Sequence, residues 1–311
     1  MRVKCDAFGL ECHDYQPQQV IKSVEKLFDG TETIEVDDDF IDQFYQSSDG
    51  VLLPDQNKKL FSNQYIILTG KSDPKKSAVC RFINYQVPLK KVYNFKDIWG
   101  LSANNKEQKF AMDLLFDKDI KVVSLTGQAG TGKTLIAAAC GLEQVLNSTK
   151  SQGGYDKLII TRPVQPLGRD IGFLPGTLEE KMMPWIAPIR DNLEHLFGDR
   201  TALDMQLEQG TIEIEAMTYI RGRSISNAFM VVDEAQNLTP HELKTIITRV
   251  GHGTKLILTG DIQQIDNSYV DAVSNGLTYA VEKFKEYEIS GHVSLIKGER
   301  SKLATLASEI L

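Results

Sequence analysis

Apolar and polar residues follow two different periods along the chain, and the change between them divides it near residue 95. Before this point, short apolar runs alternate with turn-forming residues, which is typical of short strands in a small barrel or sheet. These strands are expected at Tyr65–Leu68, Ala78–Tyr85 and Lys90–Tyr93. After it, longer apolar runs alternate with segments of helical periodicity. The pattern predicts a small β-rich module in residues 1–95 and a larger domain in residues 96–311.

Five apolar runs in the larger domain have the length and the β-branched composition of buried strands. They are Lys121–Thr126, Lys157–Thr161, Ala228–Val232, Lys255–Thr259 and His292–Ile296. Helical periodicity predicts helices at Asn104–Phe116, Lys133–Leu146, Thr177–Phe197, Pro240–Val250 and Tyr269–Phe284. Strands that alternate with helices form a mostly parallel sheet covered by helices on both faces. The predicted fold class is therefore α/β.

Two of these helices contain informative prolines. Thr239, Pro240 and Glu242 have the spacing of a capping box with proline at the first helical position, so a helix should begin there. Pro184 and Pro188 fall inside the long predicted helix, where each removes a backbone donor. We expect them to interrupt that helix.

The first fifty residues carry less structural information. The segment Gln18–Phe28 has the apolar spacing of a short amphipathic helix. The segment Glu32–Asp42 holds six acidic residues, among them three adjacent aspartates. Consecutive carboxylates do not converge on one ion, so this segment is predicted to be a solvated acidic turn rather than a metal site.

A glycine-rich sequence follows the first buried strand and precedes a helix, which is the context that a phosphate-binding P-loop requires. Its residues are Gly127, Gln128, Ala129, Gly130, Thr131, Gly132, Lys133 and Thr134. Glycines let backbone N–H groups turn towards phosphates, and the start of the following helix favours negative charge. Lys133 is expected to bind the β- and γ-phosphates, and the Thr134 hydroxyl to bind Mg²⁺. The sequence therefore predicts a nucleotide-binding protein.

A second strand, Ala228–Val232, ends in the acidic pair Asp233 and Glu234. Asp233 is expected to hold the Mg²⁺ shell, and Glu234 to polarise the water that attacks the γ-phosphate. A water-activating carboxylate favours hydrolysis over group transfer. The alternative is a strand that ends in two solvated acids without a catalytic role. The P-loop about 100 residues earlier favours the catalytic interpretation over this alternative.

Polar loops follow three further segments. Gln263 comes shortly after the strand Lys255–Thr259, at an edge of the sheet that points into the nucleotide crevice. Two other loops carry the arginines Arg162, Arg169, Arg221 and Arg223. Arginine forks suit phosphate oxygens, so these loops are candidates for a nucleic-acid backbone track. Charged loops in solvent are an equally weighted alternative.

Composition limits the function classes. The chain has 311 residues and a net charge of −7. This charge excludes a protein that binds nucleic acid over a broadly basic surface, so any such contact must be made by a local basic patch. The four cysteines are scattered without a C-x-x-C pair, which argues against a zinc site or a disulfide framework. No apolar run approaches a membrane span and no signal peptide opens the chain, so we expect a cytoplasmic protein without membrane contact.

Six motifs occur in order within residues 126–301: TGQAGTGKT, TRPVQPLGRDIGFLPG, YIRGRS, VVDEAQN, LTGDIQQID and GERS. Together they resemble the PhoH-like ATPase family, whose single RecA-like core is similar to that of superfamily 1 helicases. The resemblance implies ATP and Mg²⁺ as cofactors. It also implies that Gln108 reads the adenine edge, that Gln263 senses the γ-phosphate and that Arg300 is an arginine finger.

We therefore expect an ATP hydrolase coupled to single-stranded nucleic acid, with RNA favoured over DNA, similar to a helicase or translocase. A nucleotide-gated switch for protein partners and a small-molecule kinase remain alternatives. A finger at Arg300 predicts a homo-oligomer with shared active sites, for which the family suggests a ring of six; the alternative is a monomer in which Arg300 pairs with a helix-end carboxylate. The first fifteen residues resemble the end of a PIN nuclease domain in PIN–PhoH fusions, but the acidic nuclease centre is absent, so no nuclease activity is expected.

Overall fold

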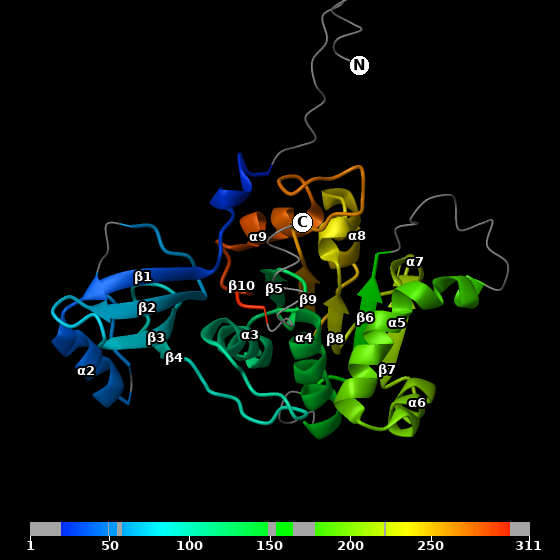
Figure 1. Cartoon of the computed structure of the whole chain (residues 1–311), viewed down its shortest axis with the longest axis horizontal. Helices are drawn as coiled ribbons and strands as arrows, with labels where there is room; N and C mark the ends of the chain where they lie inside the picture. The colour runs from blue at the N-terminus through cyan, green and yellow to red at the C-terminus, as the bar shows by residue number, and fades with distance from the viewer. Residues whose placement is uncertain are drawn as a thin grey trace, which may run out of the picture.

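Two β-sheets form the framework of the protein, which a computed structural model describes over residues 20–48, 50–54, 58–148, 154–163, 178–220 and 222–298 (Figure 1). The larger sheet has the strand order β10-β5-β9-β8-β6-β7, and all neighbouring strands in it are parallel. Its strands are β5 (Val122–Gly127), β6 (Lys157–Arg162), β7 (Ile212–Ala216), β8 (Ala228–Val232), β9 (Lys255–Gly260) and β10 (Ser290–Leu295). All five strands predicted for the larger domain are present.

Helices cover both faces of the larger sheet. On one face lie α3 (Lys106–Phe116), α4 (Lys133–Leu142), α5 (Leu178–Phe197) and α6 (Arg200–Glu208). On the other lie α7 (Met217–Ile220), α8 (Pro240–Ile247) and α9 (Gly276–Phe284). Strand β8 supplies Phe229 and Val231 to the first core and Met230 and Val232 to the second. A strand that is buried on both sides needs this continuous apolar sequence.

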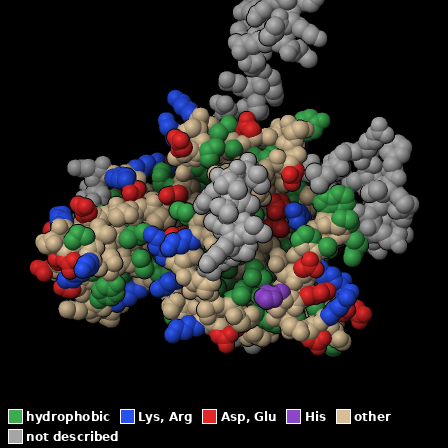
Figure 2. Space-filling view, viewed as in Figure 1, with side chains coloured by type: hydrophobic (Ala, Val, Ile, Leu, Met, Phe, Trp, Pro, Cys, Tyr) green, Lys and Arg blue, Asp and Glu red, His purple; other side chains and the backbone are tan. Residues whose placement is uncertain are grey.

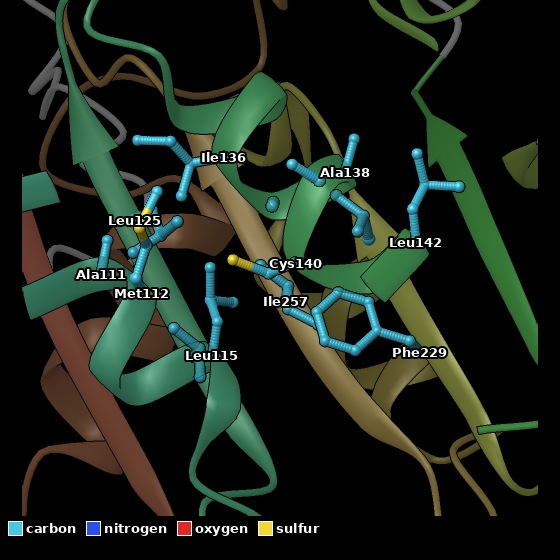
Figure 3. Close-up of a cluster of buried hydrophobic side chains, with 14 of the residues drawn as sticks. Ala111, Met112, Leu115, Leu125, Ile136, Ala138, Cys140, Leu142, Phe229 and Ile257 are labelled. Carbon is cyan, nitrogen blue, oxygen red and sulfur yellow. The ribbon is translucent and has the colours of Figure 1, made fainter. Parts of the chain in front are cut away.

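Helix α4 packs closely against the centre of the sheet because its inward face is built of small residues. Figure 3 shows Cys140 of this helix beside Ile257 of β9 and Phe229 of β8. A Cβ on Gly141 would lie only 2.8 Å from side-chain atoms of Leu158 and Phe229. The helix that begins at the P-loop is therefore held at a fixed, short distance from β6 and β8.

The strand order identifies the type of core. β9 lies between β5, which leads into the P-loop, and β8, which leads to Asp233. This insertion of one strand between the P-loop strand and the acidic strand is the RecA-like arrangement. The predicted α/β fold, with a RecA-like core and a parallel sheet flanked by helices, is confirmed. Within the described residues, no helix is long and apolar enough to cross a membrane.

The smaller sheet has the strand order β1-β2-β3-β4. Its strands are β1 (Thr31–Val36), β2 (Gln64–Gly70), β3 (Ser77–Phe82) and β4 (Lys90–Lys91). β1 is parallel to β2 while the other neighbours are antiparallel, so the module is an open mixed sheet and not a barrel. Helix α2 (Asp38–Gln46) contributes Ile41 and Phe44 to a separate core within this module. The boundary at residue 95 stays a prediction.

The acidic segment Glu32–Asp42 is not a turn, and that prediction is wrong. It contains most of β1 and the start of α2. Ile34 and Val36 are buried while the acidic residues between and before them are not, which is the alternation of a half-buried strand. Asp38 and Asp39 lie in the first turn of α2, where the helix dipole favours carboxylates.

The amphipathic helix predicted at Gln18–Phe28 is also wrong. Residues 18 and 19 lie outside the described segments, and the described remainder contains only a short 3-10 turn, η1 (Val24–Lys26). None of the three residues of η1 is buried, and the Ser23 side chain makes no capping hydrogen bond. Because the residues of η1 itself are not buried, the apolar spacing does not produce a helix in this segment.

Three predicted helices differ from the observed ones. α4 gives way after Leu142 to a π-helical turn, η2 (Glu143–Asn147). α5 continues through Pro184 and Pro188, which do not interrupt it. α9 begins only at Gly276, because the side chains of Asp271 and Asn275 bond to the preceding backbone and hold it in turns.

Strand β7 and helix α6 are not predicted from the sequence. The signal for β7 is the alternation of Ile212 and Ile214 with Glu213 and Glu215. The two glutamates are paired with cations, Glu213 with Lys157 at 2.6 Å and Glu215 with Arg223 at 2.6 Å. β7 is thus an edge strand whose outward acids are neutralised by neighbouring residues.

The smaller sheet is bound to helix α3. The Tyr65 ring of β2 stacks on Phe110 at 4.1 Å between centroids, and its hydroxyl donates to Asp113 at 2.8 Å. Arg81 of β3, which is almost fully buried, forms ion pairs with Asp113 at 3.2 Å and with Asp117. The module therefore contacts the helix whose first turn touches the P-loop.

The smaller sheet also contacts the last strand of the larger one. The Asn63 side chain donates to the carbonyl oxygen of Ser290 at 2.7 Å. The backbone N–H of Ser294 in β10 donates to the carbonyl oxygen of Asp29 at 3.1 Å. These hydrogen bonds join residues before and between the strands of the smaller sheet to the last strand of the larger one.

Candidate nucleotide-binding site

The P-loop closes around its own lysine. Gly130 and Gly132 have φ values of +82° and +88°, a region that residues with a Cβ rarely adopt. Lys133 Nζ donates to the carbonyl oxygens of Gly127 at 2.8 Å and Gln128 at 2.9 Å. The ammonium group therefore lies inside the loop that is predicted to hold the phosphates.

Asp233 connects the P-loop helix to two neighbouring strands. Its Oδ1 accepts hydrogen bonds of 2.7 Å from the hydroxyls of Thr134 and Thr259. Mg²⁺ prefers oxygen ligands and is usually held by one or two protein side chains together with substrate phosphates and water. Among the described residues, no group of three or more His, Cys, Asp or Glu side chains is placed to hold a metal. Thr134 and Asp233 therefore fit an Mg²⁺ ion that arrives with a nucleotide.

Glu234 has a backbone conformation that few non-glycine residues adopt, with φ +53° and ψ 39°. Such strain persists only where the surroundings enforce it, and it clusters at functional sites. Burial and the neighbouring Asp233 carboxylate raise the pKa of Glu234 above its ordinary value. The hydrogen bond from Gln236 and the charges of Arg162 and Lys133 act in the opposite direction. A raised pKa suits a general base that works near neutral pH.

A chain of hydrogen bonds runs from Glu234 to the P-loop. Gln236 Nε2 donates to Glu234 Oε2 at 2.5 Å, and Gln236 Oε1 accepts from the backbone N–H of Asp261 at 3.2 Å. Asp261 Oδ2 accepts from the backbone N–H of Ala129 at 3.1 Å. Neither Gln236 nor Asp261 is assigned a role from the sequence, although each is a polar residue shortly after a buried strand. Both are buried, and their hydrogen bonds connect Glu234 to the P-loop.

Gln263 lies at the rim of a cavity of about 380 Å³ beside the P-loop. Gly127 and Gln128 line the same cavity. The backbone N–H of Gln263 donates to Asp261 Oδ1 at 3.0 Å, so one carboxylate holds both the P-loop and the Gln263 loop. This position is close to the P-loop, as a γ-phosphate sensor requires. The sensing role itself stays a prediction.

Gln108 contacts the P-loop from the first turn of α3. Its Nε2 donates to the carbonyl oxygen of Thr131 at 3.2 Å, and its Oε1 accepts from the backbone N–H of Asn104 at 2.9 Å. The Asn105 side chain caps the helix by accepting from the N–H of Gln108 at 2.9 Å. Each end of the Gln108 amide therefore has one protein partner, and each keeps a second hydrogen or lone pair with which to meet an adenine edge.

The predicted arginine track is only partly described. Arg169, Arg221 and Arg300 lie outside the described residues. Arg223 is bound by Glu215 at 2.6 and 2.7 Å and by Glu213 at 3.0 Å, so a phosphate has to compete with two carboxylates for it. In the view of Figure 2, acidic and basic side chains are interspersed over the surface.

Arg162 differs from Arg223 in its surroundings. It is the last residue of β6, and its guanidinium lies 3.5 Å from Glu234 Oε1. Asp233 is joined to the same strand, because its backbone N–H donates to the carbonyl oxygen of Thr161 at 2.8 Å. The arginine that pairs with the candidate base in the described part of the chain thus lies at the carboxyl end of the neighbouring strand.

Comparison with known families matches residues 100–309 to the family described as PhoH-like protein. This span is about two-thirds of the chain and includes every predicted site residue from Gln108 to Arg300. The chain belongs to the PhoH-like family. The family resemblance found in the six motifs is thereby confirmed.

Relatives in this family extend over the smaller sheet as well. The Protein PhoH2 of Bacillus subtilis (strain 168) is 44% identical over 315 residues, which cover 100% of this chain and 70% of that protein. The Protein PhoH2 of Mycolicibacterium smegmatis is 35% identical over 312 residues, covering 100% of this chain and 68% of that protein. The solved UvsW helicase from bacteriophage T4 covers 95% of this chain and 76% of its own, with 13% identity and a TM-score of 0.39, a likeness too weak to bear on function.

Proposed function

We propose that this PhoH-like protein hydrolyses ATP with Mg²⁺ and couples hydrolysis to a single strand of nucleic acid, with RNA preferred to DNA. The supporting observation is the hydrogen bond between Thr134 and Asp233, which brings together residues 99 positions apart and places Glu234 beside the P-loop. Family membership supports a nucleotide-hydrolysing role.

Each side chain has its own task in this proposal. The P-loop N–H groups and Lys133 bind the phosphates. Thr134 and Asp233 hold Mg²⁺, which neutralises charge on the phosphate oxygens when it is bound. Glu234 takes a proton from the attacking water. Gln263 contacts the γ-phosphate and Gln108 contacts the adenine, as the family resemblance implies.

The nucleic-acid half of the proposal is supported by Arg162. A phosphate backbone bound at the carboxyl edge of the sheet reaches this arginine, and the guanidinium in turn touches Glu234. Binding of a strand and activation of water thus share one side chain. Arg169, Arg221 and Arg223 remain proposed members of the same track.

The deciding experiment measures phosphate release from ATP with Mg²⁺ alone, with single-stranded RNA and with single-stranded DNA. We expect hydrolysis in all three and the largest stimulation by RNA. Strand binding should weaken steeply with salt, because each phosphate contact releases counterions. Glu234→Gln is the control for contaminating ATPases. Equal hydrolysis with and without strands would leave a nucleotide-gated protein switch as the better reading, and transfer of phosphate to an acceptor would favour a kinase.

We further propose that the active protein is a homo-oligomer in which Arg300 of one copy reaches the γ-phosphate of its neighbour. A single core has no second core to supply this charge, and head-to-tail contacts close into a ring when the rotation per subunit permits it. Mixing two inactive variants, Arg300→Ala and Lys133→Ala, should restore part of the activity, because some interfaces combine an intact finger with an intact P-loop. Absence of recovery, with a monomeric mass in ATP and Mg²⁺, contradicts this arrangement.

A further inference from the structure

A second cavity, of about 240 Å³, lies between the end of β6 and helix α5. Its lining includes Arg162, Pro184, Trp185, Pro188, Asn237 and Asp266. Cavities that bury a whole drug-sized ligand measure about 300–1,000 Å³. This cavity is smaller, and it suits a single ring system. None of the catalytic roles proposed above uses it.

One wall of the cavity is apolar and comes from a single turn of α5. Trp185 follows Pro184 directly in that turn, and Pro188 comes four positions after Pro184. A proline inside a helix destabilises it by about 3 kcal/mol, because the ring clashes with the preceding turn and removes a hydrogen bond. The two prolines flank the partly exposed Trp185, so this wall is apolar and has little backbone freedom. Hydrophobic side chains gather over the region of α5 in Figure 2.

The opposite wall is polar and continuous with the candidate active site. Arg162 lines the cavity and also contacts Glu234. The backbone N–H of Asn237 donates to the carbonyl oxygen of Glu234 at 3.0 Å, and Asn237 Oδ1 accepts from the backbone N–H of Asp266 at 2.8 Å. The loop that ends at Asp266 is the loop that carries Gln263. Any occupant of the cavity therefore touches residues bonded directly to the candidate base.

The chemistry of the two walls fits a nucleobase. Single-stranded nucleic acids are bound by aromatic side chains that stack on bases and by cations that hold the backbone. Trp185 supplies the aromatic face and Arg162 the cation, while the Asp266 carboxylate can accept from a base amino group. Grooves for proline-rich peptides also use aromatic residues, but they line an extended polyproline helix with several of them. Trp185 is the single aromatic residue among those that line this cavity in the described part of the chain.

We propose that this cavity binds one nucleotide of the single strand, with its base stacked on Trp185 and its adjoining phosphate held by Arg162. The proposal rests on the proposed function, since it assigns a place to the strand. It also gives the strand a route to hydrolysis. The Arg162 guanidinium lies 3.5 Å from Glu234 Oε1, so a phosphate that binds this guanidinium competes directly with the candidate base for it.

Tryptophan fluorescence tests the base contact directly, because the chain has two tryptophans. Trp99→Phe leaves Trp185 as the reporter, and Trp185→Phe leaves Trp99, whose ring packs on Phe197 at 4.9 Å. We expect single-stranded RNA to quench Trp185 but not Trp99. A strand of the same length with abasic residues keeps the phosphates and should not quench Trp185.

An affinity cycle gives a second measurement. Trp185→Ala should weaken binding of the base-containing strand on the order of ten-fold, and should not change binding of the abasic strand. Tyr287→Ala is the matched control, because it removes an exposed aromatic side chain away from the cavity. Circular dichroism checks that Trp185→Ala is folded, and the quenching experiment with Trp99→Phe does not depend on that variant.

The outcomes separate this inference from the proposed function. Salt-dependent binding of RNA with no quenching of Trp185 and no effect of Trp185→Ala overturns the cavity assignment and leaves the proposed function intact. Quenching by a proline-rich peptide and not by RNA also overturns it. Failure of every strand to bind or to stimulate hydrolysis removes the proposed function, and this inference with it.

Discussion

The Thr134 hydroxyl donates a 2.7 Å hydrogen bond to Asp233 Oδ1, and Thr259 donates to the same oxygen at the same distance. Asp233→Asn should therefore disturb the Mg²⁺ site more than the fold. We expect the Mg²⁺ concentration for half-maximal hydrolysis to rise on the order of 10–100-fold. Titration of ATPase activity with Mg²⁺ measures it. Asp119→Asn, at an exposed position, is the control, and an unchanged midpoint in Asp233→Asn contradicts the metal assignment.

Removing the candidate base should separate binding from chemistry. Glu234→Gln cannot accept the proton of the attacking water, so hydrolysis should fall about 10²–10⁴-fold. ATP binding should remain, because the P-loop and Lys133 are intact. Equilibrium binding of a fluorescent ATP analogue and single-turnover hydrolysis measure the two quantities. Near-normal turnover in this variant removes the base assignment.

The pH profile should report the raised pKa of Glu234. As pH falls through that pKa, the carboxylate of the free enzyme takes up a proton and stops acting as a base, so the acid limb of kcat/KM should lie above the ordinary glutamate range. Arg162 lowers this pKa, so Arg162→Gln should move the acid limb to still higher pH. Arg249→Gln, at an exposed position, should not move it. A shift of the limb to lower pH in Arg162→Gln contradicts the electrostatic coupling.

The buried arginine between the two sheets offers a stability test. Arg81→Ala leaves Asp113 and Asp117 without their buried partner and should lower the free energy of unfolding by about 3 kcal/mol. Lys90→Ala is the matched control, because Lys90 is half exposed and its Nζ lies as far as 3.9 Å from the Asp117 carboxylate. This variant should change the free energy of unfolding by less than about 1 kcal/mol. Urea unfolding measures both. Equal effects of the two variants would show that burial does not govern this pairing.

A buried lysine predicts a dependence of stability on pH. Lys255 is fully buried and donates to the carbonyl oxygens of Leu114 and Asp117, and burial lowers its pKa to about 7. Between this pKa and the ordinary lysine value of 10.5, the unfolded chain binds a proton that the folded chain does not, so Lys255 makes stability rise with pH across this window. Lys255→Met should flatten the rise. Lys118→Met, at an exposed position whose charge is not among those that shift the pKa of Lys255, should retain it, and identical slopes in the two variants contradict the burial effect.

Local chemistry could be predicted from the sequence. The capping box of Thr239 and Glu242 forms as expected, because the residues that make it are three positions apart. The P-loop likewise depends on eight consecutive residues and their flanking elements. The pairing of Thr134 with Asp233 could be anticipated only because the P-loop gives the acidic strand end a partner.

Features that depend on tertiary contacts could not be predicted in the same way. Gln236 and Asp261 connect the site through hydrogen bonds between segments about 25 residues apart or more, which no local pattern reveals. The late start of α9 depends on side chains that bond the backbone at Asp271 and Asn275. The acidic residues of β1 make its sequence resemble a solvated turn. Its strand conformation depends on the parallel pairing with β2, and only two of its residues are buried.

The hydrogen bonds from Asn63 to Ser290 and from Ser294 to Asp29 bear on how the protein is made. Chains are synthesised from the N-terminus at about 5–20 residues per second, and early regions can fold before later ones exist. The smaller sheet can pair its own strands early, but its contact with β10 must wait until residue 294 has left the ribosome. Its surface facing β10 therefore stays open to solvent and to chaperones for most of synthesis. Burial of that surface against β10 is therefore among the last steps of folding during biosynthesis.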